Sequence, residues 1–350
     1  MTSFVLGIDI GGSGSRVAIR EVAAGGVDAT AGARPRARRR ELTGERVGIT
    51  ATGSSVPETA LALLRAARAA WPEEFAGVGT PRGIVGVGLG ATGLATLVEH
   101  PERVAESLQR ELGSMSHPTD AATPPPVAVA IDAVTAHLGA LAGAGGAIVA
   151  LGTGAIALGT DGRDVWCRVD GWGHLLGDRG GGAWIGLRGL DAAIRAHDGV
   201  DDAGTALLAA ARHRFGEVLT WPNQLYTRAD RAGVLAGFTA DVARLATAGD
   251  AAARHIMTDA GTEAARSVLA ALAPGIPPRV AATGGLIAAG GALAAAFSST
   301  IASLRPDVEV VAPVGDPLDG ALLLAERMAG GSALRHPSYL WSTSDVGGTP

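Results

Sequence analysis

One pattern occurs twice in this chain: an apolar run, a short glycine turn and a second apolar run. The first copy spans residues 4–20 around Gly11-Gly12-Ser13-Gly14, and the second spans residues 147–159 around Gly152-Thr153-Gly154. Both copies predict a β-hairpin, whereas a dinucleotide-binding turn would lead from a strand into a helix. Strands and helices follow each copy, so the sequence predicts an α/β fold whose architecture, though not its sequence, is duplicated.

The composition of the two turns indicates phosphate binding. Glycine lets a backbone approach a phosphate closely and turn through positive φ, and both are difficult for a residue with a Cβ. The first turn leads into Ser15 and Arg16, and Asp9 precedes it. Two such turns, each leaving a strand, suggest two loops that hold one polyphosphate.

The remaining segments complete the expected fold. Strands are predicted at 84–89, 127–131, 279–282 and 308–311. Helices are predicted at 57–71 (with Ser54 or Ser55 as cap), 101–112, 133–142 and 317–328, and over most of 183–274 with a break at Trp221-Pro222.

The proline-containing segment 113–126 resembles a linker. We therefore expect an N-terminal domain at 1–126 and a C-terminal domain at 127–350, with the final helix packing back on the N-terminal domain. The polar tail from Gly330 onward is expected to be loosely held.

The chain contains no lysine, because all 29 of its basic residues are arginine. A P-loop of the G-x-x-x-x-G-K-[ST] type is therefore excluded, and so is a kinase built around a phosphate-binding lysine. Backbone amides, magnesium and an arginine would have to hold a nucleotide.

Other bulk properties narrow the class of protein. A net charge of −5 and a pI near 5.9 give no general attraction to nucleic acid or to a membrane. Arginines gather between residues 34 and 40, where a solvated loop or strand edge is expected. A single cysteine, Cys167, allows no disulfide within the chain and favours a cytoplasmic location, and we find no signal peptide. The uncharged stretch 280–304 is interpreted as strand, turn and buried helix.

The motifs and their order resemble the actin-like sugar kinases, in the branch of N-acetylglucosamine and glucosamine kinases that includes the BadF/BadG-type ATPases and actinobacterial glucosamine kinases. The matching segments are Gly7 to Ser13 (first phosphate loop), Asp132 at a strand end, Gly152-Thr153-Gly154 (second phosphate loop), Gly171 to Asp178 with Gly180, Ala183, Trp184 and Ile185 (sugar loop), and Thr283-Gly284-Gly285 (adenosine loop). The resemblance implies two ribonuclease H-like domains, an active-site cleft between them, ATP and Mg²⁺ as cofactors, and often a homodimer.

The resemblance also implies roles for single residues. Asp132 would be the catalytic base and contact the sugar, although its position alone favours a helix N-cap. Asp9 would lie on the magnesium side, and Thr153 would contact phosphate or sugar; either is otherwise a turn residue. Gly11, Gly12, Ser13, Ser15 and Arg16 complete the nucleotide residues expected in the first hairpin.

In the sugar loop, Asp178 matches a carboxylate that binds sugar hydroxyls. His174 is expected to be a structural histidine with its hydrogen bonds satisfied, and Trp172 and Trp184 are expected to pack rather than stack on a ligand. Cys167 is expected to be inert.

The chain departs from the N-acetylglucosamine kinase pattern at three places. Ala155-Ile156 stand where that pattern has Ser-Asn, Asp170 replaces a glycine, and Arg179 replaces an acidic residue. Asp170 adds a carboxylate beside the expected sugar site, which would favour an ammonium group; a surface turn residue is the alternative. Glucosamine is therefore the predicted substrate and N-acetylglucosamine the second choice. A non-catalytic sugar sensor or an ATPase activator of the same fold stays open, although activators usually carry iron–sulfur cysteines.

Overall fold

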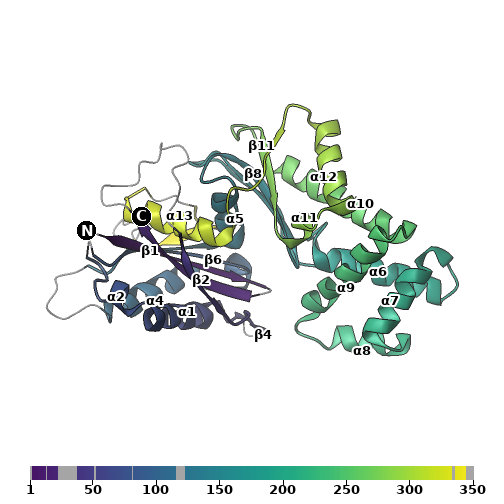
Figure 1. Cartoon of the computed structure of the whole chain (residues 1–350), viewed down its shortest axis with the longest axis horizontal. Coiled ribbons are helices and arrows are strands. Elements are labelled where there is room, and N and C mark those ends of the chain that lie inside the picture. Colours follow the sequence, from purple (N-terminus) through teal and green to yellow (C-terminus); the bar gives the residue numbers. More distant parts are fainter. Residues whose placement is uncertain are drawn as a thin grey trace. The chain divides into compact units, whose positions relative to one another are not determined.

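A computed structural model describes residues 2–12, 14–22, 38–50, 53–80, 82–115, 123–332 and 336–343. The chain forms two compact units (Figure 1). Unit 1 combines residues 1–144, 162–164 and 314–350, and unit 2 combines residues 145–161 and 165–313. Unit 2 is thus inserted into unit 1, and the boundary differs from the one predicted after residue 126.

Unit 1 is built on a six-stranded sheet with the order β13-β7-β6-β1-β2-β3. Its strands are β1 (Ser3–Gly11), β2 (Gly14–Val22), β3 (Arg40–Gly44), β6 (Ile84–Ala91), β7 (Val127–Ile131) and β13 (Leu340–Ser342). β1, β6 and β7 run parallel, while β1 and β2 form the predicted antiparallel hairpin with Gly11 opposite Gly14. Because β7 pairs with β6, the segment before β7 connects two parts of one sheet and does not separate domains. A two-stranded ribbon adds β4 (Ile49–Thr50) and β5 (Gly53–Ser54).

The helices of unit 1 are α1 (Val56–Ala70), α2 (Pro72–Phe75), α3 (Leu94–Leu97), α4 (Pro101–Gly113), α5 (Asp132–Ala140) and α13 (Pro317–Ala329). α13 lies against β1 and β6 (Figure 1). Three strand glycines make this close approach possible: a Cβ would lie 2.8 Å from Leu322 if added to Gly7, 2.5 Å from Ala325 if added to Gly86 and 2.2 Å from Ala321 if added to Gly88. The final helix therefore packs on the N-terminal unit, as the sequence predicted.

One local prediction for unit 1 is wrong, and another is confirmed only in the position of the residue. Part of the tail is held in the sheet, because β13 pairs with β7 and Leu340 is buried opposite Ala130. Ser55 stands at the N-cap position of α1 but its side chain makes no capping bond; its hydroxyl instead accepts the amide of Gly48 at 2.7 Å.

Unit 2 contains a five-stranded sheet with the order β10-β9-β8-β11-β12. The strands are β8 (Gly146–Leu151), β9 (Ala155–Thr160), β10 (Trp166–Asp170), β11 (Arg279–Thr283) and β12 (Glu309–Val310). β8, β9 and β10 are successively antiparallel, and β11 and β12 continue parallel to β8. Unit 1 has the same sequential order in β3-β2-β1-β6-β7, so the predicted duplication of architecture is confirmed.

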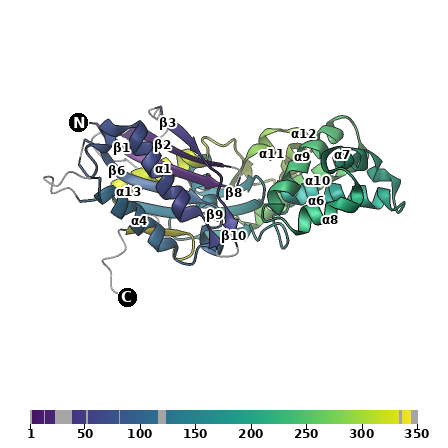
Figure 2. The ribbon, with the colours of Figure 1, turned by 90° about the horizontal axis from the view of Figure 1, so that it is seen from below.

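The helices of unit 2 are α6 (Gly182–His197), α7 (Thr205–Phe215), α8 (Trp221–Tyr226), α9 (Arg231–Thr247), α10 (Ala251–Ala270), α11 (Gly285–Ala288) and α12 (Gly291–Leu304), with 3₁₀ turns at Asp202–Gly204 and Val218–Thr220. α6 packs on α9 and α10 packs on α12, and Figure 2 shows these helices grouped together. Pro222 occupies the first turn of α8, where its missing N–H costs no hydrogen bond.

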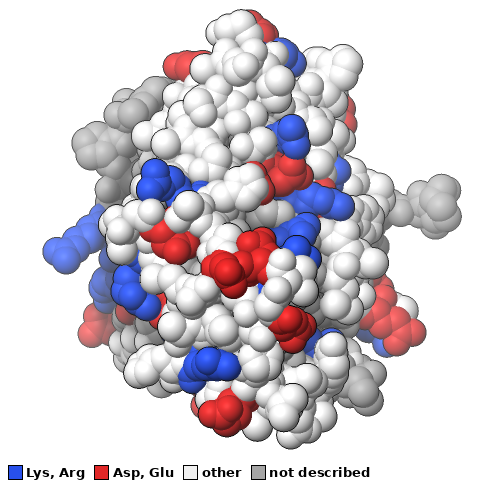
Figure 3. All heavy atoms as spheres, turned by 90° about the vertical axis from the view of Figure 1, so that its right-hand side faces the viewer, with Lys and Arg blue, Asp and Glu red and all other residues white. Residues whose placement is uncertain are grey.

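Two surface properties bear on possible partners. Among the helices of the described ranges, none is both long and apolar enough to cross a membrane. Figure 3 shows acidic and basic side chains interspersed over one face of the molecule.

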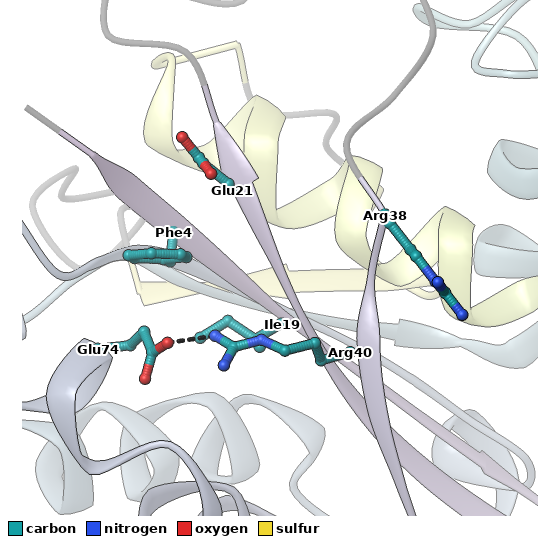
Figure 4. A pocket seen from close by; sticks show the side chains of 6 residues that line it. All are labelled: Phe4, Ile19, Glu21, Arg38, Arg40 and Glu74. Carbon is teal, nitrogen blue, oxygen red and sulfur yellow. Dashed lines mark hydrogen bonds and ion pairs between the residues drawn. The ribbon is translucent and has the colours of Figure 1, made fainter.

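A shallow hollow of about 380 Å³ lies in unit 1 beside β3, the strand at the edge of the sheet. Its lining residues are Phe4, Ile19, Glu21, Arg38, Arg40 and Glu74 (Figure 4). Arg40 points across the hollow to an ion pair with Glu74. The arginine-rich segment thus includes a strand edge, as expected, while Arg34 and Arg36 lie outside the described residues. None of the predicted site residues lines this hollow.

Candidate functional site

Asp9 and Asp132 lie at the same edge of the sheet in unit 1. The parallel register aligns Asp9 with Gly90 on β6, and Gly90 with Ala130 on β7. Asp9 therefore lies near the end of β1 and Asp132 directly after β7, with β6 between these two parallel strands. Two strand spacings, roughly 10 Å, separate β1 from β7. Open α/β sheets bind their ligands at this carboxyl edge. The fold therefore brings together the predicted base and the predicted magnesium-side aspartate.

Asp132 is the first residue of α5, and the N-cap position is taken by Ile131. The alternative interpretation of Asp132 as N-cap therefore does not hold. Its side chain is half-buried, and its carbonyl accepts a hydrogen bond of 3.0 Å from the hydroxyl of Thr135. Thr135 packs directly on Gly90, where an added Cβ would be 2.0 Å from its hydroxyl oxygen. This contact fixes the start of α5 beside the end of β6, and the helix N-terminus favours negative charge there.

Asp9 is mostly buried and forms an ion pair with Arg16, whose Nη2 lies 2.8 Å from Asp9 Oδ2. Burial raises the pKa of Asp9, although the hydrogen bond and charge of Arg16 act in the opposite direction. In the part of the chain that the structure describes, Oδ1 of Asp9 receives no hydrogen bond. An oxygen of this carboxylate is thus available for a cation or for a water molecule bound to it.

Arg16 links Asp9 to the start of α13, because its Nη1 lies 2.9 Å from Asp316. Arg39 binds both Asp316 and Asp319 at 2.7 and 2.8 Å. Asp316 and Asp319 also form the capping box of α13. Sequence reasoning missed this network, although the Asp-Pro-x-Asp spacing before an apolar run is a recognisable capping signal.

The same network continues along α13. The guanidinium of Arg20 is buried, and it binds Glu326 at 2.6 Å and approaches Asp319 at 3.6 Å. Two arginines of β2, together with Arg39 just before β3, thus hold α13 at several points along its first three turns.

The remaining residues of the first phosphate loop divide into two groups. Gly12 and Gly14 have open space where a Cβ would be, so this turn is accessible to a ligand. Ser15 is buried and donates its hydroxyl to the carbonyl of Glu45 at 2.5 Å, so its side chain makes a structural bond, and the contact of Ser15 with a cofactor stays a prediction. Ser13 lies outside the described residues.

In unit 2, the second phosphate loop and the adenosine loop lie side by side. β8 and β11 are parallel, with Thr283 aligned to Ala150 at their carboxyl ends. Gly284 has φ +104°, and an added Cβ there would be 2.2 Å from the carbonyl oxygen of Leu151. The absence of a side chain at this position therefore allows the two loops to touch.

The start of α6 is tied to the second phosphate loop. The amides of Gly182 and Ala183 donate to the carbonyls of Gly152 and Thr153, each at 2.8 Å. Thr153 is half-buried and Gly152 is exposed. These bonds fix the turn, which confirms the predicted hairpin.

The sugar loop places Asp178 against this hairpin. Asp178 adopts φ +57°, and its Oδ1 accepts the amide of Gly173 at 3.0 Å. Its carboxylate also accepts the amide of Ala155, and its Oδ2 would be 2.3 Å from a Cβ on Gly154. Burial raises the pKa of Asp178, with repulsion from Asp170 adding to it and the backbone hydrogen bonds opposing it.

Asp170, the predicted extra carboxylate of the sugar site, is 6% exposed. Oδ1 accepts the amide of Asp178 at 2.7 Å, and Oδ2 accepts the amide of Arg179 at 2.8 Å. Both oxygens are therefore used by the backbone of the loop itself, an arrangement that favours a structural role over direct contact with a sugar.

Other side chains of the sugar loop differ from expectation. Nε2 of His174 is buried with no hydrogen-bond partner within the described ranges, so the predicted satisfied histidine is wrong; burial, with Arg231 nearby, lowers its pKa. Trp172 is 61% exposed rather than packed, and Arg168 lies 4.5 Å from its ring centre. Trp184 packs against the core of unit 2 as predicted.

The residues at the carboxyl edge of the sheet in unit 1 fit a magnesium nucleotide. No group of three or more His, Cys, Asp or Glu side chains in the described ranges could hold a metal ion by itself. Mg²⁺ bound to a nucleotide needs no such group, because one carboxylate, water and phosphate oxygens are its usual ligands. Asp9 would hold the ion in this way, and the open turn at Gly12 and Gly14 leaves room for phosphates.

Comparison with known proteins identifies the family. Residues 6–325 match the BadF/BadG/BcrA/BcrD ATPase family, and the chain belongs to it. The fold is accordingly the duplicated α/β fold that the resemblance implied.

Solved structures agree with this fold. A candidate N-acetylglucosamine kinase from Chromobacterium violaceum is 25% identical, covers 91% of this chain and 98% of its own, and has a TM-score of 0.61. One from Porphyromonas gingivalis is 16% identical, with coverages of 93% and 99% and a TM-score of 0.60. A ROK family glucokinase from Streptomyces griseus, in complex with glucose and AMPPNP, is 18% identical, with coverages of 94% and 98% and a TM-score of 0.52.

Proposed function

We propose that this protein is a sugar kinase that transfers the γ-phosphoryl group of ATP to the 6-hydroxyl of D-glucosamine. Membership of an ATPase family supports the use of ATP, and the similarity to a candidate N-acetylglucosamine kinase supports an amino sugar as acceptor. The observation that carries the proposal is that Asp9 and Asp132 lie at the same edge of one sheet. At this edge, Asp9 can bind a cation and Asp132 can accept a proton.

Each residue has a chemical task in this reaction. Asp132 takes the proton of the attacking 6-hydroxyl and contacts the sugar, and Asp178 accepts hydrogen bonds from other sugar hydroxyls. Thr153 and the glycine turns at 11–14 and 152–154 hold phosphates, while Thr283, Gly284 and Gly285 hold the adenosine. Arg16 keeps Asp9 in place. Mg²⁺, when bound beside Asp9, neutralises charge on the phosphates, and positioning with charge neutralisation is most of what phosphoryl transfer requires.

The choice of glucosamine is supported by the side chains around the sugar loop. Ile156 stands where the N-acetylglucosamine kinase pattern has an asparagine, and its side chain fits against the Cα of Gly171, which could not carry a Cβ without a contact of 2.7 Å. Its surface is thus used in packing and offers no partner to an acetamido group. The carboxylate of Asp178, which is proposed to meet the sugar, gives this loop a negative charge that favours a substrate carrying an ammonium group. N-acetylglucosamine is the second candidate, favoured by the similarity to the Chromobacterium protein.

A coupled assay of ADP release tests the proposal. The purified protein is given ATP and Mg²⁺ with glucosamine, N-acetylglucosamine, glucose or no sugar, and kcat/KM is compared. We expect release that depends on sugar, is highest with glucosamine and stops in excess chelator. Release without sugar would indicate an ATPase regulator, and sugar binding without release would indicate a sensor; either result refutes the kinase. Higher kcat/KM with N-acetylglucosamine would refute the substrate alone. Sedimentation of the same sample tests the homodimer that the resemblance implies.

A further inference from the structure

We infer that Asp170 is a positioning residue that sets the carboxylate of Asp178 for substrate binding and does not itself contact the substrate. The inference rests on the proposed function, since it assigns Asp178 the sugar hydroxyls. It differs from the recognition of an ammonium group that the sequence suggested for Asp170.

The first support is the set of bonds that Asp170 makes. Each of its two oxygens accepts one backbone amide, from Asp178 and from Arg179, at 2.7 and 2.8 Å. Its side chain is 3% exposed, and the guanidinium of Arg179 approaches it at 3.9 Å. A buried carboxylate bound in this way by adjacent amides fixes the backbone at Asp178.

The second support is the backbone conformation. Asp170 and Asp178 have φ of +62° and +57°, and they are two of the three non-glycine residues with positive φ among those described. Such values are uncommon outside glycine, though aspartate tolerates them better than most residues. Both ends of the nine-residue turn from Asp170 to Asp178 are therefore held in conformations that the hydrogen bonds of Asp170 help to maintain.

The third support is the close packing of a glycine against one side of each carboxylate. A Cβ on Gly177 would lie 2.2 Å from Asp170 Oδ1, and a Cβ on Gly154 would lie 2.3 Å from Asp178 Oδ2. Asp178 in turn accepts amides from Gly173 in the loop and Ala155 in the second phosphate hairpin. A continuous set of bonds thus leads from Asp170 through Asp178 to the hairpin.

This arrangement makes a specific kinetic prediction. If Asp170 acts only through Asp178, removing its carboxylate weakens the binding of glucosamine and of N-acetylglucosamine by the same factor and leaves the KM for ATP unchanged. A direct contact with an ammonium group would instead weaken glucosamine alone. The expected rise in sugar KM is on the order of 10-fold, as for the loss of hydrogen bonds to a charged group.

The test is a double-mutant cycle. Asp170→Gly keeps the positive φ accessible and removes both acceptors, Asp178→Asn alters the proposed ligand, and the double variant combines them. Asp164→Asn, an exposed aspartate between the neighbouring strands β9 and β10, is the control. Sugar KM, ATP KM and calorimetric sugar binding are measured for each protein. We expect the double variant to bind sugar only slightly more weakly than Asp178→Asn alone, because the effects of substitutions at coupled residues are not additive.

Three outcomes would overturn the inference: additive losses in the cycle, a loss confined to glucosamine, or wild-type KM values in a folded Asp170→Gly protein. If a thermal melt shows that variant unfolded, Asp170→Asn replaces it, because asparagine tolerates the same φ and keeps one acceptor. A wild-type protein that neither binds nor phosphorylates any sugar would refute the proposed function, a result visible before any variant is made.

Discussion

Three aspartates of this protein differ in how easily they ionise, and burial alone does not explain the difference. Burial raises the pKa of Asp9 and of Asp178. Burial opposes the charge on Asp316 as well, but hydrogen bonds from Arg39 and from the backbone of Asp319 outweigh it, so its pKa lies well below the ordinary range. The two carboxylates with raised pKa are those proposed to meet ligands, which is a common property of functional sites.

Asp132→Asn tests the proposed base. The amide is close in size to the carboxylate but cannot take a proton, so we expect kcat to fall by roughly a hundred- to ten-thousand-fold. Sugar and nucleotide binding, measured by calorimetry, should change little. A thermal melt provides the control for folding. Near-normal kcat in a folded variant would remove Asp132 from the mechanism.

Asp178→Asn tests the effect of burial on stability. The pKa of Asp178 is raised above its ordinary value of 3.8, so between those two values the folded protein binds more protons than the unfolded chain. Stability from this group is therefore present below pH 3.8 and is lost as pH rises through the raised pKa. Asparagine has no such step. The melting temperature of the variant relative to the wild type should thus rise on going from acid to neutral pH. A difference in melting temperature that does not depend on pH would contradict the assignment.

At the residue level, the sequence predicted the carboxylates but not their partners. Asp9 and Asp132 were predicted because each comes directly after an apolar run and matches a position in the sugar-kinase pattern. The bonds of Asp170 to Asp178 and Arg179 depend on a tight turn with positive φ at aspartates, which residue type does not reveal. The sequence could not predict that Nε2 of His174 is buried without a hydrogen-bond partner among the described residues, because only the fold decides which atoms are buried.

α13 contacts several elements of unit 1, among them α5, β1 and β6. It packs on the glycine-lined strands β1 and β6, and its N-cap residue Asp316 binds Arg16 of β2 and Arg39 just before β3. Because Arg16 binds both Asp9 and Asp316, the same contacts that hold the helix also orient the proposed magnesium-side carboxylate.

Asp316→Ala tests this anchoring. The change removes an N-cap side chain and the partner of two arginines, so we expect the free energy of unfolding to fall by about 2 kcal/mol. Urea denaturation measures the change. Asp307→Ala is the matched control, because Asp307 forms an exposed ion pair with Arg305 and such pairs contribute about 0–1 kcal/mol. Equal losses in the two variants would show that the network does not hold α13.

At the element level, long periodic segments and apolar strands such as β7 and β11 were predicted, whereas β10 and β13 were not. α4, α13 and both glycine hairpins have clear apolar patterns, and the structure confirms them. The sequence of β10 does not alternate clearly between apolar and polar residues. β13 has only three residues, and they are hydrogen-bonded to β7. Such strands exist because a neighbour pairs with them, which a local pattern cannot show.

At the scale of the molecule, the domain boundary was the main error of the sequence prediction. A proline-containing segment was interpreted as a linker, but it joins α4 to β7 within unit 1. The actual division depends on contacts between residues far apart in the chain. α5 packs on α13, and an added Cβ on Gly139 would lie 2.0 Å from the carbonyl oxygen of Asp316. The sequence alone does not predict that contact.

The insertion of unit 2 into unit 1 leads to a prediction about folding. The amide of Val314 donates to the carbonyl of Ala140 at 2.9 Å, so the two chain segments that leave and re-enter unit 1 are adjacent. Residues 145–313, of which only 162–164 are grouped with unit 1, can therefore be replaced by a flexible linker of about six residues without straining unit 1. We expect the joined protein to fold cooperatively, as measured by circular dichroism and a thermal melt.

Residues 1–144 alone provide the control. They lack α13, so Val5 and Ala18 lose Leu318, Leu322 and Ala325, with which they form a buried cluster. The glycine-lined face of β1 and β6 would then be exposed to water, and no side chain of the sheet itself could cover it. We expect this fragment not to melt cooperatively. A cooperative melt of the short fragment, or an unfolded joined protein, would show that α13 does not complete the core of unit 1.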